Sequence, residues 1–594
     1  MSHSRSPRRS RIVLLCGLLL AAILPAQAQT VVRLRLESLE GALSDLGTVS
    51  RAAGTELPPA AALAMLAGNL GVPDLGMVDR GRPVVLAFPV EGLMLGMRGA
   101  VAALPVSDPA AAIEALAARF EHHDQQGEVH VFGDVGGPSL HVTIRGDYLL
   151  ATGVPELLAA FDLGEALARG DLPPGNLSAD VLLDPLQPMA QMGLAAAQQQ
   201  LAAAGEGPDA GDAPAMDPDL VASMLGWYGN VLGDLFNNVE RLQVAVQVAD
   251  DHLLLRKRLV PKPGSTLAGL VAAQAGGLPG TARLLDPGAP VVVAGQFVVT
   301  QAFRTAMREF LQGYFKMMTG VTSGMSESGA AEQARATLEL WTAGPDPLLT
   351  RSVDCMQGDY AAQFDLTPGN GMSMVAIQGH GAGDRCRDLL SDILRGSGEA
   401  MRALSPVSVT VTPEAVRHAG LVADRMEWTL TPPEGTSDPE AEAAMEALFG
   451  GKVLRTYMAS TDDLWISVMG GDAEDRFRAL AEQLDRSASG GGLRDDFVAP
   501  IETGPGFFGR ADLGALLSRI AAILPADEAE EAAELGAAAT RLTGAAGRIT
   551  FGLKLDAAGP RATIALPLAL LRVLAEEMEE DGEDEGPMGP LQGR

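Results

Sequence analysis

The chain of 594 residues is poor in aromatic side chains, which make up 4% of it. Pockets for sugars, bases and planar cofactors usually draw on aromatic rings, so this composition favours a scaffold of Ala, Leu and Val without a bound cofactor. Basic residues are also scarce: 44 Lys and Arg stand against 75 Asp and Glu, giving a formal net charge of −31 at pH 7. Such a charge repels polyanions, so we expect no nucleic-acid partner.

One compact basic cluster interrupts this acidic composition, at Arg256, Lys257 and Arg258, with Lys262 beyond it. The cluster falls at the end of an expected strand, where charged residues commonly face water. We therefore interpret it as the solvated face of a strand rather than a phosphate site.

Residues 1–28 have the pattern of a bacterial export signal. Four arginines precede an apolar run at residues 12–24, and the small residues Ala26 and Ala28 follow. The run is too short to span a bilayer stably, and a signal peptidase needs small side chains where it cuts. We expect cleavage after residue 28 and a periplasmic or secreted protein. Losing four positive charges would leave that protein with a net charge of −35.

Three alternatives fit the first residues less well. Arg8 and Arg9 suggest twin-arginine export, but the next residues match that pattern poorly, which favours the Sec route. Cys16 lies behind bulky Leu15, where a lipid-attachment site needs a small residue. An uncleaved anchor would leave the small residues of the cleavage site as a coincidence. No second run reaches the length of a membrane span, so a soluble mature protein without a transmembrane segment is expected.

Only Cys355 and Cys386 lie outside the signal. In an oxidising compartment such a pair can form a disulfide, closing a loop of about 32 residues worth roughly 3 to 4 kcal/mol. The pattern places Cys355 just before a strand and Cys386 near the start of a helix. The spacing permits a bridge and equally permits two buried free thiols, and counting thiols distinguishes the two.

A helix, a two-stranded hairpin and a second helix occur twice in the same order. The hairpin strands alternate apolar and polar residues, and each return strand ends at a proline. The segments are 217–238, 241–248, 253–260 and 265–273 in the first copy, and 527–545, 548–555, 561–566 and the helix after Pro567 in the second. Upstream, strand and helix pairs at 147–152 with 154–168 and at 463–468 with 472–485 continue the parallel.

The parallel also includes short strands at 179–183 and 507–511, each followed by a candidate helix cap, Asp184 or Asp512. Four elements in one order predict two homologous halves. We assign 1–28 to the signal, 29–280 and 288–575 to the halves, and 576–594 to a disordered acidic tail. A helix is also expected at 58–70.

Helix starts and loops have their own signals. Asp108 and Asp438 each precede a proline, a combination typical of the first turn of a helix. The segments 204–216 and 320–330 are rich in Gly with Pro, Asp or Ser, so we expect exposed loops there.

Alternating strands connected as hairpins, with helices between them, predict an α+β fold of antiparallel sheets with packed helices, in two related halves in tandem. The alternation favours sheets with one wet face or one face covered by helices. Residues 146–153, a strand between two glycines that runs into a helix, follow an exported start. In these features most of the mature chain resembles exported bacterial proteins known only as domains of unknown function. The resemblance implies no catalytic residues.

Four histidines, His122, His123, His130 and His141, lie within twenty residues, with Asp124 and Asp134 nearby. Imidazole and carboxylate groups can assemble a metal site. Against this, neither H-x-x-x-H nor H-E-x-x-H spacing occurs, and His130 and His141 fall at polar positions of alternating strands. They are low-ranking metal candidates, and solvent-facing imidazoles are the favoured interpretation.

Motifs for catalysis are weak. The segment 379–383, Gly-His-Gly-Ala-Gly, lies between a strand and a helix, but Asp384 occupies the third-glycine position of G-x-G-x-x-G, where its charge would repel a pyrophosphate. We expect a tight structural turn there. Around Ser326, Ser328 replaces the second glycine of a nucleophile elbow, and Cys355 has no clear His partner. Paired acids at turns, such as Asp462 and Asp463, satisfy local donors.

The sequence therefore predicts an exported, non-catalytic protein whose two halves present sheet or groove surfaces to a protein or an apolar ligand of the cell envelope. Two alternatives stay open. One is an envelope hydrolase with an unrecognised site near residues 122–141. The other is a periplasmic lipid or lipoprotein carrier, because sheets with one apolar face can curl around acyl chains.

Overall fold

The structure is a computed structural model, and it describes residues 30–70, 76–134, 137–204, 218–249, 251–324, 338–339, 341–343, 347–394, 407–430, 446–485, 493–494, 497–524 and 528–583. The chain divides into two compact units. Unit 1 comprises residues 1–210, 228–265 and 574–594, and unit 2 comprises residues 211–227 and 266–573. The boundary after residue 265 precedes the expected break at 280–288, because Ala282, Leu285 and Ala289 pack into a core of unit 2.

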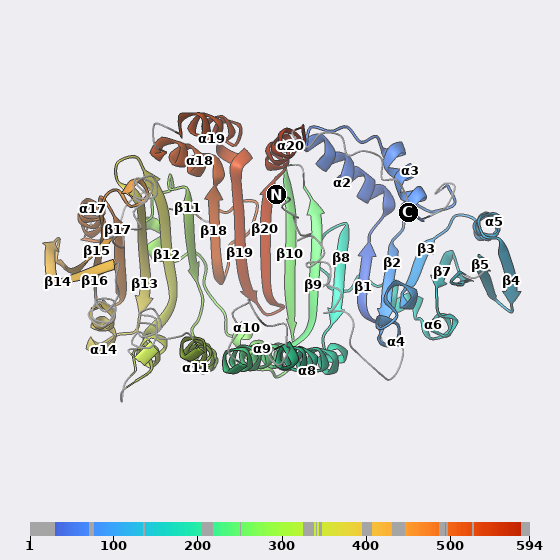
Figure 1. Ribbon diagram of the computed structural model, residues 1–594, viewed down its shortest axis with the longest axis horizontal. Coiled ribbons are helices and arrows are strands. Elements are labelled where there is room, and N and C mark those ends of the chain that lie inside the picture. The colour runs from blue at the N-terminus through green and yellow to red at the C-terminus, as the bar shows by residue number, and fades with distance from the viewer. Residues whose placement is uncertain are drawn as a thin grey trace. The chain divides into compact units, whose positions relative to one another are not determined.

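Unit 1 contains an antiparallel sheet (Figure 1). Its strands lie in the order β10-β9-β8-β1-β2-β3-β7-β6-β5-β4, and each neighbouring pair is antiparallel. The strands are β1 Thr30–Leu36, β2 Val84–Pro89, β3 Val101–Pro105, β4 His122–Gln126, β5 Val129–Gly133, β6 Leu140–Arg145, β7 Tyr148–Thr152, β8 Leu177–Leu182, β9 Val239–Val248 and β10 His252–Pro261.

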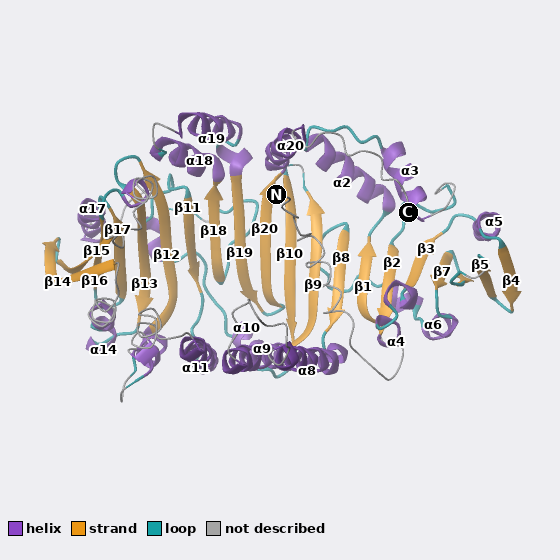
Figure 2. Cartoon of the chain, viewed as in Figure 1, coloured by secondary structure: helices purple, strands orange, loops and turns teal. Residues whose placement is uncertain are grey.

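Helices follow the strand ends of unit 1 (Figure 2). They are α2 Leu39–Ala52, α3 Pro59–Leu70, α4 Val90–Leu93, α5 Pro109–Arg119, α6 Pro155–Ala160, α7 Leu163–Leu167, α8 Gln187–Ala204 and α9 Pro218–Asn238, with short 3-10 turns η1 Gly96–Gly99 and η2 Asp184–Leu186. Residues 218–227 of α9 belong to unit 2. Since β1 and β2 are antiparallel, α2 after β1 and α4 after β2 lie at opposite strand ends.

Unit 2 has the strand order β20-β19-β18-β11-β12-β13-β17-β16-β15-β14, again with every neighbour antiparallel. This order equals that of unit 1 with ten added to each strand number. The strands are β11 Val291–Gln296, β12 Met356–Thr367, β13 Gly371–His380, β14 Val407–His418, β15 Leu421–Leu430, β16 Val453–Ser460, β17 Leu464–Gly470, β18 Gly506–Asp512, β19 Arg548–Asp556 and β20 Gly559–Pro567.

The helices of unit 2 are α10 Thr266–Ala272, α11 Gln301–Gly324, α13 Leu348–Cys355, α14 Asp384–Arg387, α17 Ala473–Asp485, α18 Leu513–Ile523, α19 Ala529–Arg541 and α20 Leu568–Glu583, with 3-10 turns η3 Gly280–Leu284 and η5 Gly544–Gly547. Residues 574–583 of α20 belong to unit 1. The predicted α+β class with antiparallel sheets is confirmed. In the part of the chain that the structure describes, no helix is both long and apolar enough to cross a membrane.

The cores lie where helices pack on the sheets. In unit 1, α6 and α7 bury Leu157, Leu158 and Phe161 against β2, β3 and β7. In unit 2, α17 packs Phe477 and Leu480 on β13, β16 and β17. At roughly 25 cal/mol per Å² of apolar area, such clusters supply most of the folding free energy.

Helix caps follow the expectations at two of the three described positions. The Asp108 carboxylate accepts hydrogen bonds from the backbone N–H groups of Ala110 and Ala111, at 3.0 and 3.1 Å. Asp512 accepts one from Ala515, at 2.9 Å. The expectation for Asp184 is wrong: it lies inside η2, makes no capping bond there, and instead forms an ion pair with Lys262. Asp438 lies outside the described residues.

Three expected segments differ in the structure. The helix expected at 154–168 divides into α6 and α7, because Asp162 caps α7 through the N–H of Glu165. α11 continues to Gly324, where a loop from residue 320 is expected. α20 continues to Glu583, so residues 576–583 are helical rather than part of a disordered tail; Glu and Met favour helix. Residues 205–217, 325–337 and 584–594 lie outside the described residues.

Candidate functional site

The four histidines do not converge in the structure. His122 and His123 lie exposed on β4, and His130 lies partly buried on β5. His123 Nε2 lies 3.1 Å from His130 Nδ1, and the His123 ring stacks on Phe132 with centroids 4.6 Å apart. Burial and the neighbouring charge of His123 lower the pKa of His130.

His141, on β6, is partly buried, as is His130, so neither is the fully solvent-facing imidazole that the alternation suggests. The buried Nδ1 of His141 makes no hydrogen bond. Among the described residues no group of three or more His, Cys, Asp or Glu side chains could hold a metal ion. Of the four histidines, His123 and His130 therefore form a pair, and the ring of His123 stacks on Phe132.

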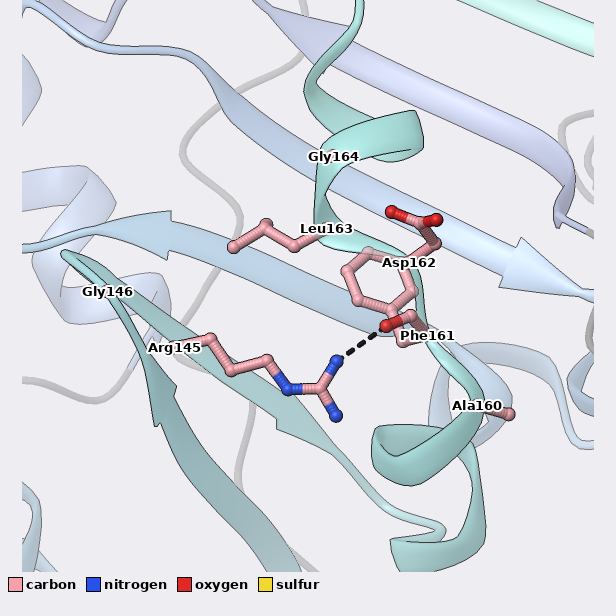
Figure 3. Close-up of a pocket in the computed structure, with 7 residues that line it drawn as sticks. All are labelled: Arg145, Gly146, Ala160, Phe161, Asp162, Leu163 and Gly164. Carbon is pink, nitrogen blue, oxygen red and sulfur yellow. Dashed lines mark hydrogen bonds between the residues drawn. The ribbon is translucent and has the colours of Figure 1, made fainter.

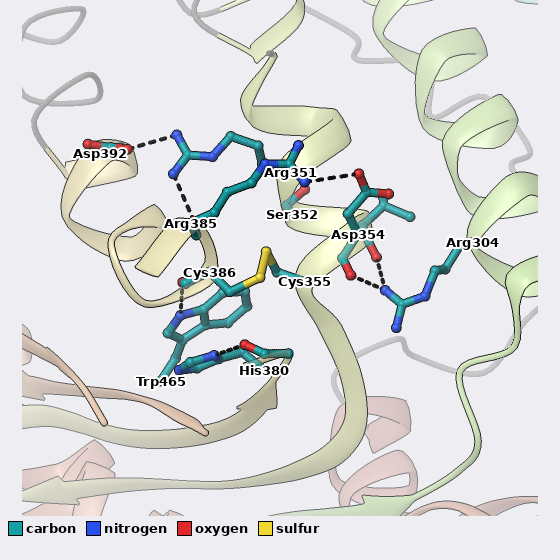
Figure 4. Close-up of a disulfide and its surroundings, with 12 residues drawn as sticks. Arg304, Arg351, Ser352, Asp354, Cys355, His380, Arg385, Cys386, Asp392 and Trp465 are labelled. Atoms are coloured by element: carbon teal, nitrogen blue, oxygen red, sulfur yellow. Dashed lines mark hydrogen bonds and ion pairs between the residues drawn. A yellow bond between two sulfur atoms is a disulfide. The ribbon is translucent and has the colours of Figure 1, made fainter. Parts of the chain in front are cut away.

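Cys355 and Cys386 form a disulfide with their Cα atoms 5.3 Å apart (Figure 4). Cys355 is the last residue of α13, directly before β12, and Cys386 lies in α14. The bridge joins a small apolar cluster that includes Leu348, Leu389 and Trp465. The indole N–H of Trp465 donates to the Cys386 carbonyl oxygen at 2.8 Å. The disulfide therefore joins fully buried Cys355 to partly buried Cys386.

The glycine-rich segment after β13 is a structural turn. His380 is fully buried, with Nδ1 at 2.7 Å from the Gly381 carbonyl oxygen and Nε2 at 3.1 Å from that of Thr461. Its ring stacks on Trp465. The imidazole is therefore packed into the structure beside the turn. The elbow-like sequence around Ser326 lies outside the described residues.

Two surface depressions are lined by polar groups, several of which are already paired. In unit 1, Arg145 donates to the carbonyl oxygens of Leu158 and Phe161 at the end of α6, the latter at 2.6 Å (Figure 3). These bonds satisfy the last carbonyl oxygens of α6, so Arg145 stabilises the end of this helix. The surrounding depression is lined by backbone, Leu163 and Asp162, which caps α7.

The second depression, in unit 2, encloses about 270 Å³ beside the start of α17. The Tyr457 hydroxyl donates to Glu474 at 3.0 Å, and Arg478 pairs with the same carboxylate at 2.7 Å. Burial and the bond to Glu474 raise the pKa of Tyr457, whereas bonds from Arg478 and Tyr457 lower the pKa of Glu474. The phenol therefore lies beside a carboxylate that Arg478 already pairs, while Asp472 and Asp475 also line the depression.

A row of polar side chains crosses the covered face of the unit 1 sheet. Arg33, Asp180, Gln243 and Arg258 are paired in register on β1, β8, β9 and β10. Arg33 bonds Asp180 at 3.0 Å and the carbonyl oxygens of α7 residue Glu165 and of Ala168, both at 2.9 Å. These side chains tie α7 to the strands.

Arg258 corrects the expectation for the basic cluster. It is 9% exposed and pairs with Asp171 at 2.9 Å, whereas Lys257 on the other face is exposed. Although burial opposes it, bonds from Gln243 and the charge of Arg258 lower the pKa of Asp171. The cluster is therefore divided between a covered and a solvated face.

Apolar side chains occupy the opposite, uncovered face of the same strands. Two register rows run across β2, β1, β8, β9 and β10, and nine of their ten positions are apolar. We call them the open face of unit 1: Val84, Leu36, Leu177, Val246 and Leu255, then Leu86, Leu34, Ala179, Val244 and Lys257. Leu177, Leu255 and Leu34 are 48%, 40% and 37% exposed. Large aliphatic side chains at such exposure on adjacent strands make this face a candidate binding surface.

Helices bound this open face at both strand ends. Leu36 packs against Leu39 and Leu43 of α2 at one end. At the other end the next row, including Val32, packs against Leu93 of α4 and Met189 of α8. Leu34, Leu177 and Leu255, between these ends, stay in contact with solvent. Strands usually place their apolar side chains under cover and their polar side chains toward solvent. These strands do the reverse: their polar side chains are covered and their apolar ones face solvent.

Unit 2 repeats this orientation. On β18 and β19, Arg510 and Thr550 are buried on the covered face, and burial together with the charge of Arg548 lowers the pKa of Arg510. On the uncovered face, Leu553 and Ile564 are 37% and 39% exposed. A Cβ added at Gly509 would lie 2.4 Å from the ring of Phe551, so the glycine allows that ring to lie flat on the sheet.

The comparisons with known proteins give no functional lead. No protein-family model matches the chain, and no curated protein or solved structure matches it.

The sequence predicts binding sheet surfaces, but its patterns do not identify which residues form the open face. The alternation was visible in strands such as residues 241–248, but it does not tell which side the helices cover. One available signal was the polar content of the covered face: Asp180 and Gln243 face arginines across the sheet, as paired buried groups do.

Proposed function

We propose that the protein is an exported, non-catalytic binding protein that holds an apolar partner or ligand against the open faces of its sheets. The observation that carries this proposal is the exposure of Leu34, Leu177 and Leu255 in adjacent strands, opposite a buried polar row. Fully burying an exposed leucine is worth about 1.5 to 3 kcal/mol. These three are 37% to 48% exposed, so covering each would contribute somewhat less than half of that, and together they favour binding.

Export is supported by two independent features. Residues 1–28, which lie outside the described residues, carry the signal pattern, and Cys355 and Cys386 are bonded in an arrangement suited to an oxidising compartment. The acidic composition is consistent with a protein that stays in solution in a crowded envelope.

We also propose that the two halves arose by duplication. Ten strands recur in one identical, non-sequential order, with the first strand of each unit lying between the second and the eighth. Chance repetition of such an order is improbable because a chain of ten strands admits many others. Both halves also leave the same face of their strands uncovered.

A lipid carrier is the second candidate. The open face of unit 1 is aliphatic apart from Lys257, and it offers few hydrogen-bonding side chains for a peptide or a sugar. Acyl chains need only apolar area. A hydrolase has less support. Within the described part of residues 122–141, the histidine contact is that between His123 and His130, and no carboxylate joins it.

The test uses N-phenyl-1-naphthylamine, an uncharged apolar fluorophore. We expect saturable binding to the full protein. The double substitution Leu177→Gln and Leu255→Gln should weaken it at least tenfold, since two contact side chains lose their apolar area. Leu46→Gln on α2 is the matched control, because Leu46 is 43% exposed but lies outside the open face.

Equal affinity in the double variant and the Leu46→Gln control would refute this function. So would the absence of saturable binding to the unsubstituted protein. Circular dichroism of all three proteins establishes that the substitutions leave the fold intact.

A further inference from the structure

A short apolar projection follows α4 in unit 1. Residues 94–98, which we call the 94–98 tip, read Met-Leu-Gly-Met-Arg, and all five are exposed. Met97 is 70% exposed, Met94 54% and Leu95 50%. Three large apolar side chains in four consecutive residues form a contiguous patch rather than scattered surface residues.

The tip has a rigid base. Gly92 and Gly99 lie back to back, and a Cβ added to either would lie 1.9 Å from the carbonyl oxygen of the other. The carbonyl oxygen of Arg98 accepts a hydrogen bond from the N–H of Gly153 at 3.1 Å, which fixes the tip to the end of β7. Its three apolar side chains are therefore held outward, while Leu93 just before them anchors α4 in the core.

The neighbouring helix α8 carries no charged side chain. α8 joins the same apolar cluster as α4 through Met189, and Met192 one turn later is 57% exposed. None of the 18 residues of α8 is Asp, Glu, Lys or Arg. Residues 92–105 contain no acid either. In a chain with 75 acidic residues, α8 and residues 92–105 together hold a single charged side chain, Arg98, while Glu91 directly precedes that segment and Glu156 follows shortly after Gly153.

We propose that this end of unit 1 docks on a lipid bilayer, with Met94, Leu95 and Met97 inserted between headgroups and Arg98 paired with lipid phosphate. A projecting aliphatic tip suits a soft interface, because a protein partner would need a pocket shaped to receive it. Long cationic side chains commonly keep their charge at the headgroup level while their stems lie in apolar surroundings.

Charge selects the kind of bilayer. The net charge of −31 repels an anionic surface, so binding to zwitterionic phosphatidylcholine should exceed binding to vesicles rich in phosphatidylglycerol. Added salt should change binding to the neutral vesicles little, because apolar insertion is not screened. This docking does not depend on the open face, whose residues are different.

Vesicle flotation tests the docking with the protein as its host releases it. The full protein should float with phosphatidylcholine vesicles, and Met94→Gln with Met97→Gln should reduce the partition coefficient at least tenfold. Leu46→Gln, on α2, is the matched control and should float like the unsubstituted protein. All three proteins are processed in the same way, so any apolar run at residues 12–24 that stays uncleaved contributes equally to each.

Methionine oxidation gives a second measurement at the site itself. Met97 should react readily with hydrogen peroxide in solution, and vesicles should slow its oxidation several-fold relative to a methionine peptide added to the same sample. Equal flotation of the double variant with unslowed oxidation of Met97 would overturn the proposal. So would protection of Met97 at high protein concentration without vesicles, because that result assigns the tip to a protein interface.

Discussion

Removing the disulfide between Cys355 and Cys386 should destabilise unit 2 without affecting unit 1. The bond closes a loop with a sequence separation of 31. On the chain-entropy model, closing a loop of this length raises the free energy of the unfolded chain by about 3.5 kcal/mol. Alanine in place of both cysteines keeps the site apolar, so we expect the double variant to lose about that amount.

Tryptophan fluorescence isolates the relevant transition, because all four tryptophans of the chain lie in unit 2. Two of them, Trp341 and Trp465, contact the bridge region directly. With a urea dependence of about 3 kcal/mol per M, the loss should lower the midpoint of this transition by roughly 1 to 1.5 M. The unsubstituted protein under dithiothreitol should approach the same midpoint.

The same reductant should not move the Cys355→Ala, Cys386→Ala variant, which has no bridge to lose. A variant midpoint within about 0.3 M of the oxidised protein would contradict the calculation. Alkylation of both cysteines in peptides from unreduced protein would refute the bridge itself.

Three further substitutions test local features. Gly509→Val should destabilise unit 2 by about 3 kcal/mol or more, because the new side chain would displace the Phe551 ring; a fluorescence-monitored urea curve that does not shift would contradict the packing. Asp512→Ala should cost about 1 kcal/mol by removing the cap of α18, measured in the same way, and no loss would deny the cap a role. His123→Gln should raise the pKa of His130, followed by NMR, because a like charge is removed. The depressed pKa means that His130 favours the folded state above its ordinary pKa of 6.5, and that this contribution is lost as the pH falls through the folded value. An unchanged titration of His130 in the variant would show that burial alone sets it.

Local patterns predicted most strands and helices because they depend on neighbouring residues. The alternation at 241–248 and 253–260 matches β9 and β10, and the Asp108 cap is made by residues two and three positions away. The break between α6 and α7 was missed because apolar residues continue through it. The cap at Asp162 outweighs that continuity.

The candidate site was less predictable, since it depends on what covers a sheet. Alternation groups Leu34 with Ala179 and Arg33 with Asp180, but it cannot tell which pair faces solvent. That is decided by α7 and residues 168–174, which bind Arg33 and Arg258 from more than 80 positions away. A rule that places apolar residues under cover would have chosen the wrong face.

Native mass spectrometry of the protein taken directly from its producing cell tests the binding function most directly. We predict bound species of defined mass on the unsubstituted protein, spaced by methylene units if the ligand is a lipid, and their loss from the Leu177→Gln, Leu255→Gln variant. A bare protein in every preparation, or the same bound mass on both proteins, would contradict the assignment of the open face as the binding surface.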